Sequence, residues 1–148
     1  ESTLVIIGHC PSTSFYKKLK TEINKGIELD VSTTPISHAE IVQKILNSDF
    51  GIVSYNVNPS NENCMPTKVF EYLAYGLPIT CQSETIWSEY ISKFNAGVFL
   101  NFKQFELAST ADQLIKFNKS FIYKDIPEVR WETEEKKFVE LINQILLK

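Results

Sequence analysis

The chain has 148 residues, of which 43% are hydrophobic and 22% are charged. This length fits one domain of ordinary size, and the composition is that of a soluble globular protein with enough apolar residues for a core. The formal net charge is −3, without the basic surplus that nucleic-acid-binding domains carry. No nucleic-acid partner is therefore expected.

Targeting signals, structural metals and disulfides are not expected either. No apolar run approaches the roughly 18 residues of a membrane helix, and no basic segment precedes an apolar one at the N-terminus, so the sequence shows no signal peptide. The three cysteines, Cys10, Cys64 and Cys81, are widely spaced and odd in number. Their number and spacing fit neither a disulfide framework nor a zinc site. We therefore expect each cysteine to be a small buried residue, and the protein to be cytoplasmic.

Strand-like and helix-like segments alternate along the chain. Apolar runs ended by Gly or polar residues predict strands, and apolar residues three or four positions apart predict helices. In chain order, the predicted elements are a strand at residues 4–7, a helix at 11–26, a strand at 27–31, a helix capped by Ser37 and carrying residues 41–46, a strand at 50–55, a loop at 56–64, a helix at 66–75, a strand at 77–81, a helix at 83–94, a strand at 97–100, and two helices at 103–118 and 132–147.

This alternation predicts one α/β domain over residues 1–148: a Rossmann-like, doubly wound parallel sheet with helices on both faces, in three layers. The strands are almost continuously apolar, as burial on both faces requires. Such sheets bind ligands at the carboxyl ends of their strands. The loops at those ends are expected to begin at Gly8, Val31, Tyr55, Cys81 and Leu100.

The most informative segment spans residues 63–79, where a loop leads into a helix. The first turn of a helix presents backbone N–H groups and the positive end of the helix dipole, which together favour an anion. Glu71 lies about one turn into this helix, where its carboxylate can accept hydrogen bonds from neighbouring hydroxyls such as those of a ribose. On the other helix face, core spacing is shown by Phe70, Leu73, Ala74 and Leu77.

This segment also carries a motif, P-x-K-x-x-E-Y-x-A-x-G-x-P. It occupies, without a gap, Pro66, Lys68, Glu71, Tyr72, Ala74, Gly76 and Pro78. The motif resembles the signature of group 1 glycosyltransferases, a retaining family with the GT-B fold, in the C-terminal nucleotide-sugar-binding domain. The resemblance implies that Glu71 holds the nucleotide ribose and that amides around Met65 and Thr67 meet the donor's sugar and phosphates. Lys68 is a candidate phosphate contact, whereas Pro66 has no N–H to donate.

The chain departs from the family pattern at one position. The family's first motif glutamate would fall at position 63, where this chain has Asn63; Glu62 is one residue away. An amide can bond a sugar hydroxyl but carries no charge. Asn63 is therefore a candidate contact to the donor sugar.

Weaker likenesses extend the resemblance over residues 3–147. The first strand and its following Gly8 and His9 are similar to the family's segment near the pyrophosphate. The loop at residues 31–37, which includes Thr33, matches the one that usually meets the nucleobase. Residues 48–52 resemble the strand before the motif, and Trp131 opens a helix like the domain's last one.

The resemblance implies a donor-binding domain for a nucleotide sugar based on UDP or GDP. The complete enzyme, of the kind used in polysaccharide biosynthesis, would transfer the sugar with retention to a glycan, lipid or other acceptor. It implies no cofactor and no metal, because the fold usually works without a divalent cation. It also implies no catalytic residue in this chain, because the groups that act on the acceptor belong to an N-terminal acceptor-binding domain or partner chain. Peripheral membrane association of the full protein stays open.

By the same resemblance, the chain lacks the family's first strand–helix unit. We therefore expect an exposed strand edge and no transfer activity from this chain alone.

Other interpretations stay open. The chain could be a non-catalytic nucleotide-sugar-binding or partner module of a split glycosyltransferase, or part of a GT-B-like epimerase. A signalling receiver is disfavoured, because no acidic residue follows the first strand. Glu71 could simply pair with Lys68 on the helix surface, and Thr67 could only cap the helix.

The last predicted helix carries an apolar stripe. Its members are Phe138, Ile142, Ile145 and Leu146. This spacing predicts packing on the core or on a partner domain.

Overall fold

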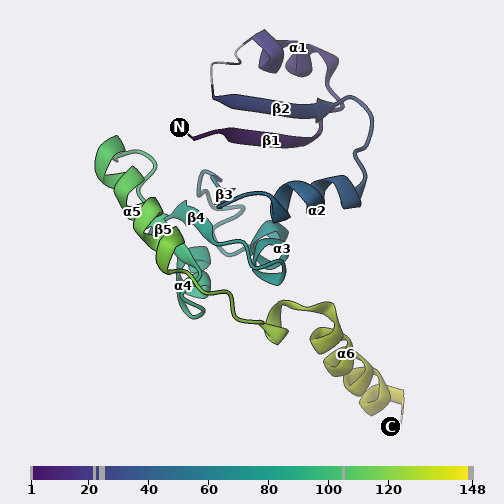
Figure 1. The fold of residues 1–148 in the computed structure, drawn as a ribbon. Helices are drawn as coiled ribbons and strands as arrows, with labels where there is room; N and C mark the ends of the chain where they lie inside the picture. The colour runs from purple at the N-terminus through teal and green to yellow at the C-terminus, as the bar shows by residue number, and fades with distance from the viewer. Residues whose placement is uncertain (1, 22, 24–25, 105, 147–148) are drawn as a thin grey trace. The chain divides into compact units, whose positions relative to one another are not determined.

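The computed structural model describes residues 2–21, 23, 26–104 and 106–146 (Figure 1). The chain is an α/β protein whose contacts divide it into two compact units, unit 1 (Glu1–Asn47) and unit 2 (Ser48–Lys148). The predicted α/β class and the parallel direction of the strands are confirmed. Within the described residues the strands form two hydrogen-bonded sheets, and the three-layer, doubly wound arrangement stays a prediction.

Unit 1 contains two strands and two helices. They are β1 (Leu4–His9), α1 (Thr13–Thr21), β2 (Ile27–Ser32) and α2 (His38–Leu46). β1 and β2 pair in parallel from Leu4 opposite Ile27 to His9 opposite Ser32. The predicted cap of α2 is confirmed: the Ser37 hydroxyl accepts from the Glu40 amide, and the Glu40 carboxylate accepts from the Ser37 amide.

Two predicted boundaries in unit 1 are wrong. β1 continues through Gly8 and His9, which were predicted to lie in the following loop. The ladder to β2 accounts for this, because it supplies backbone partners as far as the amide of Cys10, which donates to the Ser32 carbonyl. The second boundary is the end of α1, which is shorter than predicted: the helix ends at Thr21, so Ile23 lies beyond it. The remaining predicted helical positions, 22 and 24–25, are outside the described residues.

Unit 2 contains three strands, four α-helices and one short 3₁₀ helix within the part of the chain that the structure describes. They are β3 (Gly51–Val53), α3 (Thr67–Ala74), β4 (Ile79–Gln82), α4 (Ile86–Ser92), β5 (Gly97–Leu100), α5 (Leu107–Ser120), η1 (Pro127–Val129) and α6 (Trp131–Leu146). The strand order is β3-β4-β5, all parallel. Each predicted element of this unit exists, with ends shifted by a few residues.

The core of unit 2 lies between one face of this sheet and the helices α3 and α4. Strand side chains alternate between faces, and the inward face carries Val53, Ile79 and Cys81, each at most 1% exposed. Opposite them pack four helix residues: Val69, Leu73, Trp87 and Ile91. Val69 was missing from the predicted core face although it is fully buried, and Phe70 is instead half-buried against the ring of Tyr90.

The structure bears on two further expectations about apolar residues. Cys10 and Cys81 are buried as predicted, but Cys64 is exposed, because it lies in the loop before α3. The apolar stripe of α6 does not pack on the core of unit 2. Its members Phe138, Ile142, Ile145 and Leu146 are 37–76% exposed, and α6 packs chiefly against η1. Packing on a partner domain stays a prediction.

The close contact of β5 with β4 and α4 depends on Gly97. A methyl group added there would lie 2.6 Å from the Ile79 carbonyl oxygen and 2.8 Å from Cγ2 of Ile91. We expect Gly97→Ala to lower the free energy of unfolding by about 1–3 kcal/mol, because a backbone oxygen cannot move aside as a side chain can. Thermal unfolding followed by circular dichroism measures this. The control is Gly8→Ala, where nothing lies within 4 Å of the added methyl; equal effects of the two changes would contradict the argument.

The central strand carries a hydroxyl without a partner. Thr80 is 4% exposed, and its Oγ1 is the one buried side-chain oxygen or nitrogen among the described residues that lacks a hydrogen bond. A buried, unsatisfied hydroxyl costs about 1–3 kcal/mol. Thr80→Val should therefore preserve or raise the unfolding midpoint, whereas Thr80→Ser, which keeps the hydroxyl and deletes the methyl group, should lower it. A Val variant less stable than the Ser variant would show that the hydroxyl is satisfied in solution.

Candidate functional site at the start of helix α3

The first turn of α3 follows the carboxyl end of β3 and the loop at residues 54–66. The N-cap residue is Pro66, whose extended backbone (φ −63°, ψ 134°) leads into the helix and whose side chain makes no capping hydrogen bond. Thr67 is consequently the first helical residue, and the interpretation of Thr67 as the cap is wrong. Because no side chain caps the helix, backbone amides of the first turn face the N-terminal end of α3, where an anion is favoured.

Glu71 lies one turn further along α3 and is held by Lys68. The Lys68 ammonium donates to the Glu71 carboxylate at 2.6 Å. The Glu71 side chain is only 19% exposed, while that of Lys68 is 43% exposed. Glu71 is therefore not an ordinary solvent-facing residue, although the ion pair expected from its spacing is present. The role of Lys68 in binding phosphate stays a prediction.

Tyr72 locks α3 against β3. A methyl group added at Gly51 would lie 2.4 Å from its ring. Burial raises the pKa of the Tyr72 phenol; the Glu71 and Tyr55 side chains add to this effect, and Lys68 opposes it. The phenol therefore stays neutral at physiological pH, and the motif tyrosine acts as a packing residue between helix and strand.

The motif glycine has a structural explanation. Gly76 has φ +73°, the left-handed conformation that a side chain disfavours. Around it, the Gly76 amide donates to the Leu73 carbonyl and the Leu77 amide to the Tyr72 carbonyl, which is the Schellman pattern that ends helices. The ring of Tyr123 also covers Gly76, 2.6 Å from where a Cβ would be. The end of α3 is thereby fixed.

The loop before α3 is anchored by a tryptophan that the sequence analysis did not single out. The indole Nε1–H of Trp87, on α4, donates to the Cys64 carbonyl at 2.7 Å. The Tyr55 ring meets Trp87 edge-on, with ring centres 5.9 Å apart, and Met65 packs against the core. Met65 and Pro66 are therefore half-buried and fixed, whereas Asn63 and Glu62 are exposed.

A second residue of unit 2 was also not foreseen. Glu84, just after β4, is exposed and has φ +57°, an uncommon conformation for a residue with a side chain. The sequence gives no signal for it, since Glu is not a residue that favours this conformation. The signal for Trp87 was present, because a Trp at core spacing with a polar N–H usually finds a hydrogen-bond partner.

In unit 1 the structure brings together two of the residues predicted from the sequence. Nε2 of His9 lies 3.2 Å from the carbonyl oxygen of Thr33, so the Nε2–H tautomer would donate across the carboxyl ends of β1 and β2. Gly8 lies one position earlier in β1. The predicted site residues are thus divided, with Gly8, His9 and Thr33 in unit 1 and the residues from Asn63 to Glu71 in unit 2.

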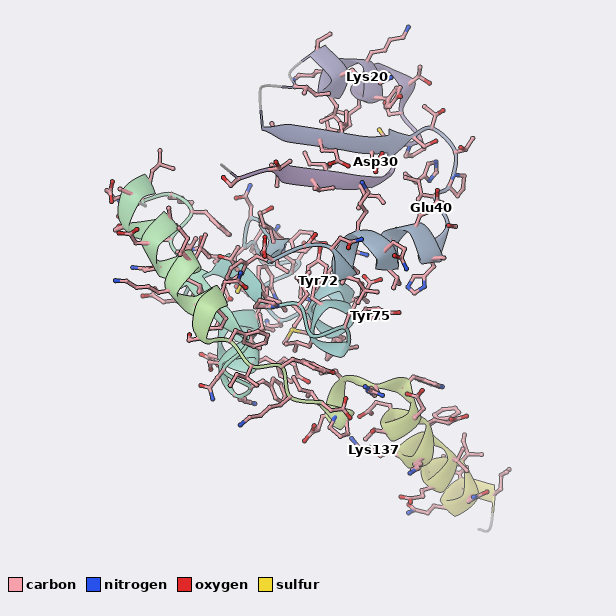
Figure 2. All side chains as sticks on the ribbon, viewed as in Figure 1. Lys20, Asp30, Glu40, Tyr72, Tyr75 and Lys137 are labelled. Carbon is pink, nitrogen blue, oxygen red and sulfur yellow. The ribbon has the colours of Figure 1, made fainter. Side chains whose placement is uncertain are left out.

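An open groove lies beside the loop that follows β2. The loop contributes Thr34, Pro35 and Ile36, and α2 contributes Gln43 and Lys44. Lys44 binds the carboxylates of Asp30 and Glu28 on β2, and these hydrogen bonds raise the pKa of its ammonium group. Asp30 on β2 and Glu40 on α2, which both line the groove, are labelled in Figure 2. The groove combines apolar and polar groups, as small-molecule sites do.

Two kinds of feature are absent from the part of the chain that the structure describes. No three His, Cys, Asp or Glu residues of this part are grouped so that they could hold a metal ion. No helix of this part is both long and apolar enough to span a bilayer.

Comparison with known proteins found no matching family model, no matching curated protein and no matching solved structure. The function of the chain therefore has to be inferred from its own residues. The residues that bear on the function are those at the start of α3 in unit 2, together with His9 and Thr33, which are in contact in unit 1.

The anchoring role of Trp87 can be measured. Trp87→Phe retains most of the buried ring but removes the N–H, so the Cys64 carbonyl loses its partner; we expect a loss of about 1–3 kcal/mol in stability. Hydrogen exchange of the amides at residues 64–68 should become faster. Trp131→Phe is the control, because Trp131 is 66% exposed. Unchanged exchange in the Trp87 variant would show that the loop is held by other contacts.

Proposed function

We propose that the chain is the nucleotide-sugar-binding domain of a retaining glycosyltransferase, and that its two units belong to the C-terminal, Rossmann-like half of a GT-B fold. The observation that carries the proposal is the position of the motif. Its proline is the N-cap of α3, its glutamate lies one turn inside, and its glycine ends the helix in a left-handed conformation. The motif thus coincides with one complete helix that starts at the carboxyl end of a parallel strand, where such sheets bind ligands.

In this proposal the first turn of α3 binds the donor's diphosphate. The amides of Thr67 and Lys68 meet the phosphate oxygens, and the positive end of the helix dipole adds to the attraction. The Lys68 ammonium is partly exposed and serves as a mobile positive charge beside them. Met65, held in the anchored loop, places its backbone next to the donor sugar, and Asn63 offers its amide to a sugar hydroxyl.

Glu71 binds the ribose. Its carboxylate can accept from both neighbouring ribose hydroxyls, and a bond to a charged acceptor is stronger than one between neutral groups. The half-buried position of Glu71 supports this role, because partial burial strengthens such bonds. The ion pair to Lys68 holds the carboxylate on α3 when no ligand is bound.

Within unit 1, considered by itself, the groove beside residues 34–36 offers surface that suits a nucleobase. Proline and isoleucine side chains offer apolar surface to a base, and the amide of Gln43 can both donate and accept. The contact of His9 with the Thr33 carbonyl fixes the loop at the start of this groove. Gly8, without a side chain, leaves room for a ligand near the end of β1.

The reaction needs the other half of the enzyme. As the bond between sugar and diphosphate breaks, negative charge grows on the leaving group, and the amides and Lys68 stabilise that charge without moving. The acceptor and the groups that act on it belong to a second domain or partner chain. This chain contributes no catalytic residue and requires no divalent cation.

Calorimetric titration without metal tests the proposal. The chain is titrated with UDP, GDP and their sugar derivatives. Either the uridine or the guanosine nucleotides should bind saturably. Glu71→Gln should weaken that binding about 10- to 100-fold, the effect of losing hydrogen bonds to a charged acceptor. Glu89→Gln, an exposed glutamate on α4, is the control. Binding that is unchanged in the Glu71 variant, or no binding of any nucleotide to the folded chain, would contradict the proposal.

A further inference from the structure

Glu84 lies at the same sheet edge as the start of α3. It follows the carboxyl end of β4, the strand that pairs with both β3 and β5, and it precedes Trp87 on α4 by one short turn of chain. The Trp87 indole donates to the Cys64 carbonyl at 2.7 Å, and the ring of Tyr55, just after β3, meets the indole edge-on. The turn that holds Glu84 is therefore next to the loop that enters α3, within unit 2 alone.

The backbone of Glu84 has an uncommon conformation. Its φ is +57°, in the left-handed region that is unfavourable for residues with a Cβ. Among the other described non-glycine residues, only Asn95 has a positive φ, at +51°, and asparagine is one of the few residues that tolerate this region. Glutamate is not, and a glycine would fit position 84 with less strain. The local backbone therefore does not explain why position 84 carries this side chain.

The carboxylate of Glu84 has no role in holding the described structure together. The side chain is exposed, and no hydrogen bond or ion pair joins it to another described residue. The capping box of α4 is made by Thr85 and Ser88, so Glu84 does not cap that helix. Strained residues persist where the strain serves a site. The adjacent site is the start of α3.

We propose that Glu84 binds hydroxyl groups of the donor sugar and thereby selects a neutral sugar over an acidic one. This inference rests on the proposed function, in which the diphosphate lies at the first turn of α3 and the sugar beside Met65. An ionised carboxylate only accepts hydrogen bonds, and its two oxygens suit two adjacent hydroxyls of a hexose. A uronic acid would bring a second carboxylate to the same place, where like charges repel.

The charge of Glu84 acts differently on a nucleotide with and without its sugar. Beside a bare diphosphate the carboxylate is unfavourable, because both groups are negative. When a neutral sugar is attached, its hydroxyls donate to the carboxylate and offset that repulsion. Removing the charge should therefore weaken binding of the neutral sugar nucleotide but not that of the bare diphosphate. General damage to the fold would weaken both.

Calorimetric titration of the chain separates these effects. The ligands are a nucleoside diphosphate, its hexose derivative and the matching uronate: UDP, UDP-glucose and UDP-glucuronate, or GDP, GDP-mannose and GDP-mannuronate. The unmodified chain should bind the neutral sugar nucleotide about tenfold or more tightly than the acidic one. In Glu84→Gln this preference should fall to about threefold or less, and the affinity for the bare diphosphate should not decrease.

A second variant tests the same residue without an amide that could replace the carboxylate. Glu84→Gly deletes the side chain and suits the backbone, so it should remove the preference while the unfolding midpoint, followed by circular dichroism, is preserved or raised. The matched control is Asn95→Gly, which changes the other described non-glycine residue with a positive φ. Asn95 precedes β5 and so lies at the amino ends of the strands; its variant should keep the preference.

The outcomes distinguish this inference from the proposed function. If nucleotides bind but the unmodified chain does not prefer the neutral sugar, or Glu84→Gly keeps that preference or weakens all three ligands alike, Glu84 does not select the sugar and the proposed function stands. If no nucleotide binds to the folded chain, the proposed function fails and this inference fails with it.

Discussion

The geometry at the start of α3 depends on one hydrogen bond between segments far apart in the sequence, from the Trp87 indole to the Cys64 carbonyl. Trp87 is buried in the core of unit 2, so its N–H is fixed in space by packing. That donor in turn fixes the loop that enters the helix, and Pro66 limits the backbone at the entry. A polar group of the core thus positions the first turn of α3, which is a firmer arrangement than a loop held only by its own residues.

The sequence predicted several local features of the two units well. The Ser37 cap, the extent of α3 and its end at Gly76 each follow from residues within a few positions of one another. The continuation of β1 through Gly8 and His9 could not be predicted in that way, because glycine weakens strands by itself. Pairing with Val31 and Ser32 overrides this local preference.

The misses in the candidate site have a similar cause. Met65, Lys68 and Glu71 were found from a linear motif, but their anchor, Trp87, comes from the next helix and is linked to them only by the fold. The division of the strands into two sheets is also a long-range property. Strand character can be read from a short segment, whereas the identity of a strand's neighbour cannot, because neighbouring strands are joined by crossovers of a dozen residues or more.

The ion pair between Lys68 and Glu71 bears on how an anionic ligand could be accepted. The Lys68 side chain is 43% exposed and that of Glu71 is 19% exposed, so solvent screens the pair from the Lys68 side, and exposed pairs contribute about 0–1 kcal/mol. Opening the pair is therefore inexpensive, while the amides of the first turn stay in place. A phosphate at that turn would give Lys68 a second anion to bind, and release of the ammonium would leave the Glu71 carboxylate to accept hydroxyls in its place. In the proposed function, the ion pair would lower the repulsion between the carboxylate and a phosphate before binding, and Lys68 could turn to the phosphate when it binds.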